Sequence, residues 1–220
     1  MYRVFIGYDP RQPVAYNVLQ HSIVRHASAP VAVIPLILSQ LQIKRRGLTE
    51  FTFSRFLVPH LCDYQGSAVF MDADMVVTGD VAVLFDTDDM SAVCVMQDQP
   101  RFEWASVMLF NCGACRRLTP EFIDDPENAL FDLAWAPYVG TLPARWNHCV
   151  GMREPAEADL YHFTQGLPCF PETAGLPEDA AWHRENEALV QSVSWQELMG
   201  SSVHRDPVLR RMLKRYTVAS

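Results

Sequence analysis

Lysine is scarce in this chain of 220 residues: Lys44 and Lys214 are its only lysines, against sixteen arginines. Acidic side chains outnumber basic ones by 26 to 18, so the formal net charge is −8. Proteins that bind nucleic acid or anionic membranes over a broad surface are normally basic, and the composition speaks against both classes. Any site for an anionic ligand therefore has to use arginine, helix N-termini, backbone amides or a metal ion.

Long apolar runs, internal repeats and low-complexity segments are also missing. A membrane-spanning helix needs about 20 apolar residues, and no signal sequence precedes the first apolar segment, residues 4–6. We therefore expect a cytoplasmic protein without a transmembrane segment, in which the six cysteines are reduced. The hydrophobic content of 49% is typical of a globular chain that folds without disulfides or metal.

The hydrophobic pattern predicts strands alternating with helices. Strands are expected at residues 4–6, 31–38, 68–71, 91–96 and 106–110. Helices are expected at residues 13–26, 51–61, 119–134 and 178–198, the second ending near Pro59. This order is typical of an α/β sandwich with a mixed, mostly parallel sheet, whose ligands bind beyond the carboxyl ends of the strands.

Asp72 and Asp74 stand inside the apolar segment 69–77, at the end of a predicted strand. Two buried carboxylates at this spacing repel each other, and a divalent cation such as Mg²⁺ or Mn²⁺ removes the repulsion. The alternative is that they cap the next turn or pair with arginine. The pattern also matches the nucleophile strand of haloacid-dehalogenase-like phosphatases. That hypothesis is weak, because those enzymes need a downstream lysine and only Lys214 follows.

Five segments occur together in one order. They are VFIGYD (4–9), FSRFLVP (53–59), VFMDAD (69–74), VMLFNCG (107–113) and LYHFTQG (160–166). This set resembles glycosyltransferase family 8, whose fold is the GT-A nucleotide-sugar-binding domain, a three-layer sandwich. The resemblance implies a single GT-A-type domain over residues 1–220. Residues 1–170 would be its nucleotide-sugar and metal-binding core, and residues 171–220 a mostly helical C-terminal extension.

The resemblance also implies roles for individual residues. Asp72, Asp74 and His162 would bind the metal, and Asn111 would hydrogen-bond the donor sugar. The segment 142–147 resembles the family's loop that lines the sugar pocket. The residues expected to contact the donor are Ile6, Gly7, Tyr8 and Asp9 at the base and ribose, Arg55 at the diphosphate or sugar, and Asp72, Ala73, Asp74 and Gly166.

Two departures from the family pattern concern the diphosphate and the catalytic group. Cys169 stands where the family has a lysine that clamps the diphosphate, so an arginine or the backbone of Gly166 would have to replace it. An Asp-Gln-Asp segment is also missing after the asparagine strand. Asp132 occupies roughly that place and joins Arg55 and Asn111 as a candidate catalytic residue, although the catalytic group stays open.

The function implied is a metal-dependent, retaining glycosyltransferase. It would move a hexose from a nucleotide diphosphate sugar, expected to be UDP-linked, to a hydroxyl acceptor such as a glycan, using Mn²⁺ or Mg²⁺. Bacterial relatives of this type point to surface polysaccharide synthesis. The alternative is a transferase-derived protein that binds a nucleotide or glycan without turnover, which the two departures favour. A nucleotidyltransferase is disfavoured, because no glycine-rich basic loop follows the first strand.

Two further features stand outside this pattern. Cys112 and Cys115 have the spacing of zinc or redox pairs, but a lone pair is weak evidence, and we expect buried inert thiols. The basic segment 205–215 is a candidate amphipathic tail for weak contact with the inner membrane face. The sequence leaves the oligomeric state open.

Overall fold

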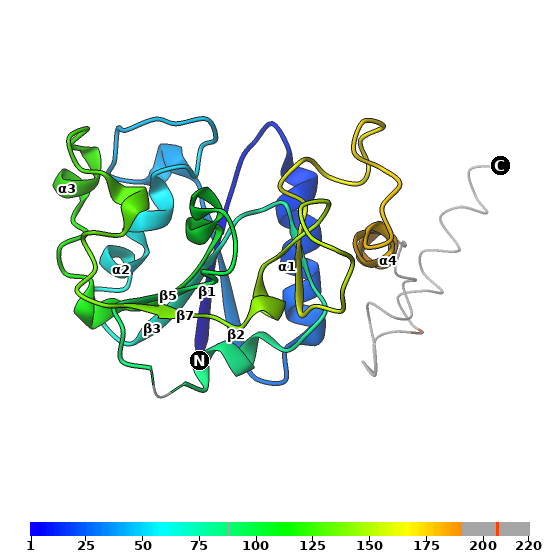
Figure 1. Ribbon diagram of the computed structural model, residues 1–220, viewed down its shortest axis with the longest axis horizontal. Coiled ribbons are helices and arrows are strands. Elements are labelled where there is room, and N and C mark those ends of the chain that lie inside the picture. Colours follow the sequence, from blue (N-terminus) through cyan, green and yellow to red (C-terminus); the bar gives the residue numbers. More distant parts are fainter. Residues whose placement is uncertain (88, 191–205, 207–220) are drawn as a thin grey trace. The chain divides into compact units, whose positions relative to one another are not determined.

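A six-stranded mixed sheet forms the centre of the computed structural model (Figure 1), in the order β2-β1-β3-β6-β5-β7. Strands β1, β2 and β3 are parallel, as are β5 and β7, whereas β6 runs antiparallel to both β3 and β5. Their apolar side chains are mostly buried, as in sheets covered on both faces. The strands span Tyr2–Gly7 (β1), Val31–Leu36 (β2), Ser67–Met71 (β3), Val93–Val95 (β5), Val107–Asn111 (β6) and Val139–Thr141 (β7).

Helices cover both faces of this sheet, which confirms the three-layer α/β sandwich. Helix α1 (Pro13–His26) lies on one side, and the short helices α2 (Val58–Leu61) and α3 (Pro120–Asp124) lie on the other (Figure 1). Pro13 occupies the first turn of α1, where its missing N–H leaves no hydrogen bond unmade.

A second, three-stranded sheet has the order β4-β9-β8. It contains β4 (Met75–Val77), β8 (His148–Cys149) and β9 (Leu160–His162). Met75 pairs with His162 across the antiparallel strands β4 and β9, and Cys149 pairs with the same histidine across the parallel strands β8 and β9. This small sheet therefore fixes His162 beside the segment that joins β3 to β4.

Two predicted helices are shorter than expected. Residues 51–61 contain a 3₁₀ turn, Ser54–Leu57, followed by α2, and Pro59 lies in the first turn of that helix instead of ending it. The long helix at 119–134 is wrong, because α3 ends at Asp124 and only a 3₁₀ turn, Leu130–Asp132, follows. Pro126 explains the early end, since the residue before a proline disfavours helical dihedrals.

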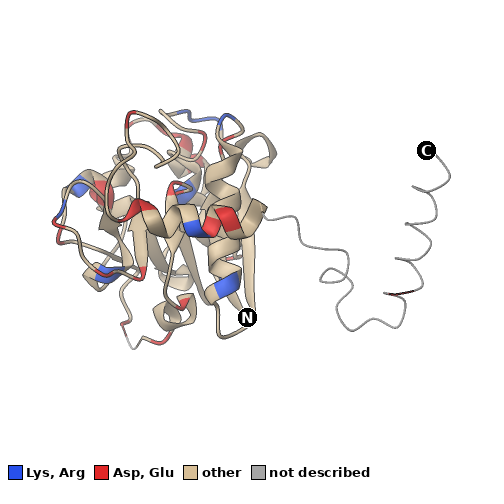
Figure 2. Ribbon diagram, turned by 90° about the vertical axis from the view of Figure 1, so that its right-hand side faces the viewer, with Lys and Arg blue, Asp and Glu red and all other residues tan. Residues whose placement is uncertain are grey.

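The structure describes residues 1–87, 89–190 and 206. Residues 1–185 form one unit and residues 186–220 another. The part of helix α4 (Asp179–Val190) that belongs to the first unit lies beside α1 (Figure 2), and its buried Glu185 contacts His21, Arg25 and His26. The basic tail expected at 205–215 lies outside the described residues apart from Asp206, and the division at residue 170 stays a prediction. Within the described part, no helix is long and apolar enough to cross a bilayer.

Candidate metal centre and adjoining cleft

Asp72 and Asp74 flank Ala73 in the link between β3 and β4. The Asp72 carboxylate is buried against Arg55, whose Nη2 lies 2.8 Å from Oδ1 and whose Nη1 donates a hydrogen bond of 3.3 Å to Oδ2. Arg55 also donates to the backbone oxygen of Ala105 at 2.7 Å, and only 6% of the residue is exposed. Arg55 is therefore held beneath the acidic pair, which speaks against its expected place facing the donor.

His162 completes the group expected from the sequence. Its Nε2 atom lies 3.4 Å from Oδ1 of Asp74, and the backbone N–H of Phe163 donates to the oxygen of Asp74 at 2.8 Å. Potential ligand atoms of Asp72, Asp74 and His162 all lie within 4.8 Å of one another. The structure thus brings together all three predicted metal ligands, which lie far apart in the sequence.

Electrostatics in this group are dominated by burial and by crowding of charge. Burial raises the pKa of Asp72 to about 7; Arg55 opposes the rise and Asp74 adds to it. Burial disfavours protonation of His162, but the carboxylates of Asp74 and Asp72 and a contact with Cys149 outweigh it and raise its pKa well above 6.5. The two acids therefore attract positive charge strongly at this point.

Two buried oxygen atoms test whether these residues fit a cation. Oδ1 of Asp74 is buried and accepts no hydrogen bond, whereas the buried Oδ1 of Asp72 has the Arg55 guanidinium as its charged neighbour at 2.8 Å. A buried carboxylate oxygen without a partner carries a substantial desolvation cost, which a bound cation offsets. Two carboxylates and an imidazole are acceptable ligands for Mn²⁺ and, less favourably, Mg²⁺. The residues present therefore fit a divalent ion.

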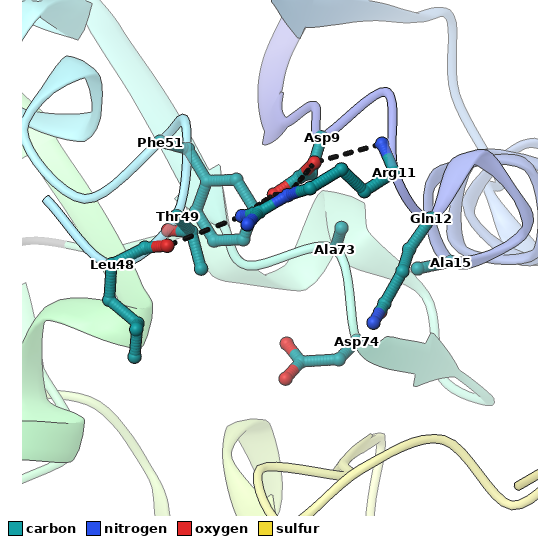
Figure 3. Close-up of a pocket in the computed structure, with 9 residues that line it drawn as sticks. All are labelled: Asp9, Arg11, Gln12, Ala15, Leu48, Thr49, Phe51, Ala73 and Asp74. Carbon is teal, nitrogen blue, oxygen red and sulfur yellow. Dashed lines mark hydrogen bonds and ion pairs between the residues drawn. The ribbon is translucent and has the colours of Figure 1, made fainter. Parts of the chain in front are cut away.

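A cleft of about 320 Å³ opens beside Asp74 (Figure 3). Asp9, at its wall, accepts hydrogen bonds from the backbone N–H and from Nε of Arg11, both at 2.9 Å. Arg11 also donates to the oxygen of Leu48 at 3.2 Å, so its guanidinium lies between β1 and the opposite loop. The Arg11 guanidinium lowers the pKa of Asp9. The family pattern pointed to Asp9 but gave no signal for Arg11.

The other residues predicted near the nucleotide have different places. Ile6 is part of the core, and Tyr8 packs edge-on against Tyr16. Gly7 leaves room for Phe51, whose Cγ lies 2.3 Å from where a Cβ would be. Ala73 and Asp9 line the cleft, but Gly166 lines a different, smaller cavity with neighbours that include Phe163 and Thr173. The structure does not bring Gly166 to the cleft.

Asn111 and Asp132 also lie apart from the acidic pair. Because β6 is antiparallel to β3, Asn111 stands opposite Ser67, at the far end of β3 from Asp72. The expected contact between Asn111 and the donor came from the family resemblance, and this geometry speaks against it. Asp132 is exposed, and its carboxylate accepts from the N–H of Ala134 at 2.8 Å, which is a local turn contact.

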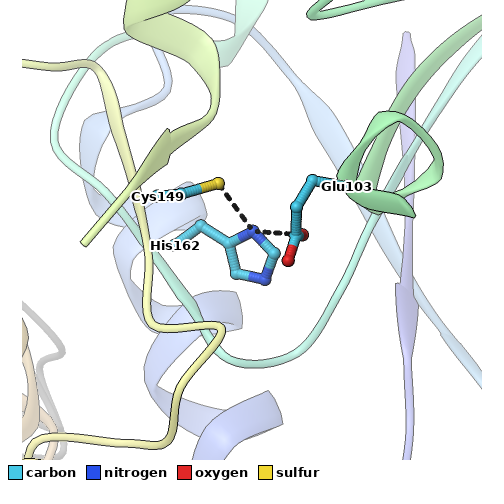
Figure 4. Close-up of side chains that lie close together, drawn as sticks. All are labelled: Glu103, Cys149 and His162. Atoms are coloured by element: carbon cyan, nitrogen blue, oxygen red, sulfur yellow. Dashed lines mark hydrogen bonds and ion pairs between the residues drawn. The ribbon is translucent and has the colours of Figure 1, made fainter. Parts of the chain in front are cut away.

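A second group of side chains surrounds the other face of His162. Glu103, Asn147 and Cys149 approach its Nδ1 atom, and Figure 4 shows two of them. Glu103 carried no signal in the sequence, whereas Asn147 closes the segment that resembles the sugar-pocket loop. The family pattern therefore pointed to the region of Asn147 but not to its contact.

The cysteine pair at 112 and 115 lies buried in the core. Cys115 donates a hydrogen bond to the oxygen of Ala92, and burial raises the pKa of its thiol to about 12. Contact with Cys62 raises the pKa of Cys112 as well. In the described part of the chain, neither thiol belongs to a group of three potential metal ligands. These contacts favour inert thiols over a zinc site.

Comparison with known proteins shows the family to which this chain belongs. No family model matches it. Protein CDI of Arabidopsis thaliana is 37% identical over 223 residues, which cover 84% of this chain and 86% of CDI. The chain belongs to the CDI family.

Solved structures similar to this CDI family member are glycosyltransferases of GT-A type. GlyE of Streptococcus pneumoniae TIGR4 has a TM-score of 0.62 at 16% identity over 84% of this chain; the chain spans only 61% of the GlyE structure. An active-site mutant of LgtC has a TM-score of 0.59 at 10% identity, covering 88% of this chain and 98% of LgtC. Mouse xyloside xylosyltransferase 1 scores 0.50 at 12% identity, covering 73% of this chain and 96% of that protein. These likenesses confirm the GT-A fold.

Proposed function

We propose that this protein is a nucleotide-sugar glycosyltransferase whose divalent cation is held by Asp72, Asp74 and His162. The observation that carries the proposal is the meeting of these three side chains beside a cleft of about 320 Å³, with the buried Oδ1 of Asp74 accepting no hydrogen bond. The GT-A fold supports it. A UDP-linked hexose, a hydroxyl acceptor such as a glycan, and retention of configuration are parts of the proposal that come from the family resemblance.

Mn²⁺ at this position would stabilise, as a Lewis acid, the negative charge that develops on the departing diphosphate. Arg55 neutralises part of the charge of Asp72 and holds its carboxylate in place. Arg11 is the one cationic side chain among the described residues that line the cleft. We therefore assign to Arg11 the contact with the donor diphosphate that the family gives to lysine. The cleft walls would limit access of water to the sugar–phosphate bond.

Calorimetric titration with Mn²⁺, and with UDP in the presence of Mn²⁺, tests the metal assignment. Asp74→Asn should weaken both affinities at least tenfold while the melting temperature of the metal-free protein changes little. Asp86→Asn is the matched control, because it removes the same charge from an exposed loop position. Unchanged Mn²⁺ affinity in Asp74→Asn would contradict the assignment.

A binding protein without turnover is the second candidate. It is favoured because the candidate catalytic residues Asn111 and Asp132 do not line the cleft. Among the described residues, Asp9 and Asp74 are the carboxylates that do. Incubation with a panel of nucleotide sugars and Mn²⁺, with released nucleotide as the readout, separates the two. Release above the rate without enzyme supports the transferase. A role in bacterial surface polysaccharide synthesis, a cytoplasmic location and contact with the inner membrane face stay predictions from sequence alone.

A further inference from the structure

The two nitrogen atoms of His162 face different surroundings. Nε2 faces Asp74, whereas Nδ1 lies 3.1 Å from Oδ1 of Asn147 and 3.5 Å from Oε2 of Glu103. Asn147, Glu103 and His162 are all almost fully buried, with exposed fractions of 0%, 4% and 2%. Buried polar groups in such a cluster have fixed partners, so the orientation of the imidazole is decided by these contacts.

The amide of Asn147 can take only one orientation here. Its Nδ2 donates to Oγ of Ser106 at 2.8 Å and to the backbone oxygen of Glu103 at 3.4 Å. The hydroxyl of Ser106 also donates to that backbone oxygen, which can only accept. Nδ2 must therefore face this pair, and Oδ1 must face His162. Because an amide oxygen only accepts, Nδ1 of His162 carries the hydrogen of their contact.

Glu103 adds a negative charge on the same side of the ring. Its Oε1 accepts a hydrogen bond of 2.6 Å from the hydroxyl of Thr164, which fixes the carboxylate. Its Oε2 then lies near the Nδ1 hydrogen of His162. Second partners of this kind orient a metal-bound histidine and make its free nitrogen a better ligand.

A cation on the Nδ1 side is the competing arrangement. Ligand atoms of Glu103, Cys149 and His162 lie within 4.8 Å of one another, and sulfur, nitrogen and carboxylate oxygen suit zinc (Figure 4). Two contacts oppose it. Nδ1 is engaged by the amide oxygen of Asn147, and the thiol of Cys149 donates to Oε1 of Gln99 at 3.1 Å. Both candidate ligand atoms are therefore engaged in other contacts.

We infer that Asn147, backed by Glu103, is a positioning residue that holds a hydrogen on Nδ1 of His162 and turns Nε2 toward Asp72 and Asp74. The role of this orientation in metal binding rests on the proposed function. The hydrogen bond between Asn147 and His162 does not, because both of its partners are side chains of this chain.

Proton–nitrogen NMR of the metal-free, ¹⁵N-histidine-labelled protein tests the hydrogen bond directly. We expect a Nδ1–H resonance, assigned by its loss in His162→Gln, that is protected from solvent exchange. Asn147→Leu should abolish this protection, whereas Asn147→Asp, which keeps an acceptor oxygen, should retain it. Ser106→Ala removes one hydrogen bond that orients the Asn147 amide and should raise the exchange rate of the Nδ1 hydrogen. It leaves the side chains that contact the His162 ring unchanged. A Nδ1–H resonance equally protected in Asn147→Leu and Ser106→Ala would overturn the inference.

Metal titration tests its consequence. Asn147→Leu should weaken Mn²⁺ binding about 10–100-fold, and Asn147→Asp and Cys149→Ser should weaken it much less. With Co²⁺ as the probe, a thiolate-to-cobalt absorption band that disappears in Cys149→Ser would place the ion on the Nδ1 side and overturn the inference. If the wild-type protein binds neither ion, the proposed metal site fails, while the NMR experiment still decides the role of Asn147.

Discussion

Met75 and His162 face each other across the antiparallel strands β4 and β9, and this pairing places the imidazole beside Asp74. Side chains alternate between the faces of a sheet, so a slip of one residue in this register would turn His162 to the opposite face. The candidate metal centre therefore depends on the register of β4 and β9 as well as on the presence of its ligands.

Arg55 should contribute strongly to stability through its contact with Asp72. Both side chains are nearly buried, so Arg55→Leu leaves a carboxylate without its partner. We expect a loss of about 3–5 kcal/mol in the free energy of unfolding, toward the lower figure because the raised pKa of Asp72 lets it become neutral. Urea denaturation at neutral pH measures the change.

Arg145→Leu is the matched control for this prediction. Arg145 pairs with Asp159, but its side chain is 61% exposed. Exposed ion pairs contribute about 0–1 kcal/mol, so this variant should unfold close to the wild type. Equal losses in the two variants would contradict the importance given to burial.

The sequence was sufficient for the fold class and for the grouping of Asp72, Asp74 and His162, whose role as metal ligands is a proposal. Apolar runs ending in Asp9 and Asp72 identified two strand ends at one edge of the sheet, and the family resemblance added His162. The position of Asn111 was not available from the pattern, because an apolar strand reads the same in either direction. Its placement depends on β6 being antiparallel to β3, which only the pairing reveals.

Contacts between distant segments were also beyond the sequence. Arg11 follows Asp9 by two residues, but its guanidinium also donates a hydrogen bond to the backbone oxygen of Leu48 across the cleft, which the sequence does not indicate. Glu103 lies within one 3₁₀ helix and Asn147 directly follows another, yet both approach His162. Such contacts arise from tertiary packing, for which hydrophobic periodicity carries no information.

Gly7 should resist substitution because of Phe51. A Cβ at Gly7 would lie 2.3 Å from Cγ of the phenylalanine, whose ring helps to line the cleft. Gly7→Ala forces this ring to move, and overpacking of this kind typically costs about 1–3 kcal/mol. We expect that loss in urea denaturation, together with weaker UDP binding in calorimetry. At Gly113 the nearest atom is 3.5 Å away, so Gly113→Ala should preserve both quantities.

Asn111→Ala should leave the metal centre intact. The residue stands opposite Ser67 and lines a separate cavity with Gly66 and Cys94. We expect the affinities for Mn²⁺ and UDP to stay within about twofold of the wild type, well under the 1.4 kcal/mol of a tenfold change. A tenfold loss without a change in the melting temperature would show that Asn111 does reach the ligand.

Arg11 should set the titration of Asp9. Its guanidinium hydrogen-bonds the carboxylate and holds the Asp9 pKa below the ordinary value of 3.8. Because the folded pKa lies below the unfolded one, this pair stabilises the fold above the unfolded pKa and loses that effect as the pH falls through the folded value. In ¹³C NMR, Arg11→Met should raise the Asp9 pKa, and its melting temperature should differ from the wild type at neutral pH but converge with it in acid. Arg46→Met, a change at an exposed arginine, should leave the Asp9 titration unaltered; an equal rise there would attribute the low pKa to net charge instead of to the direct contact.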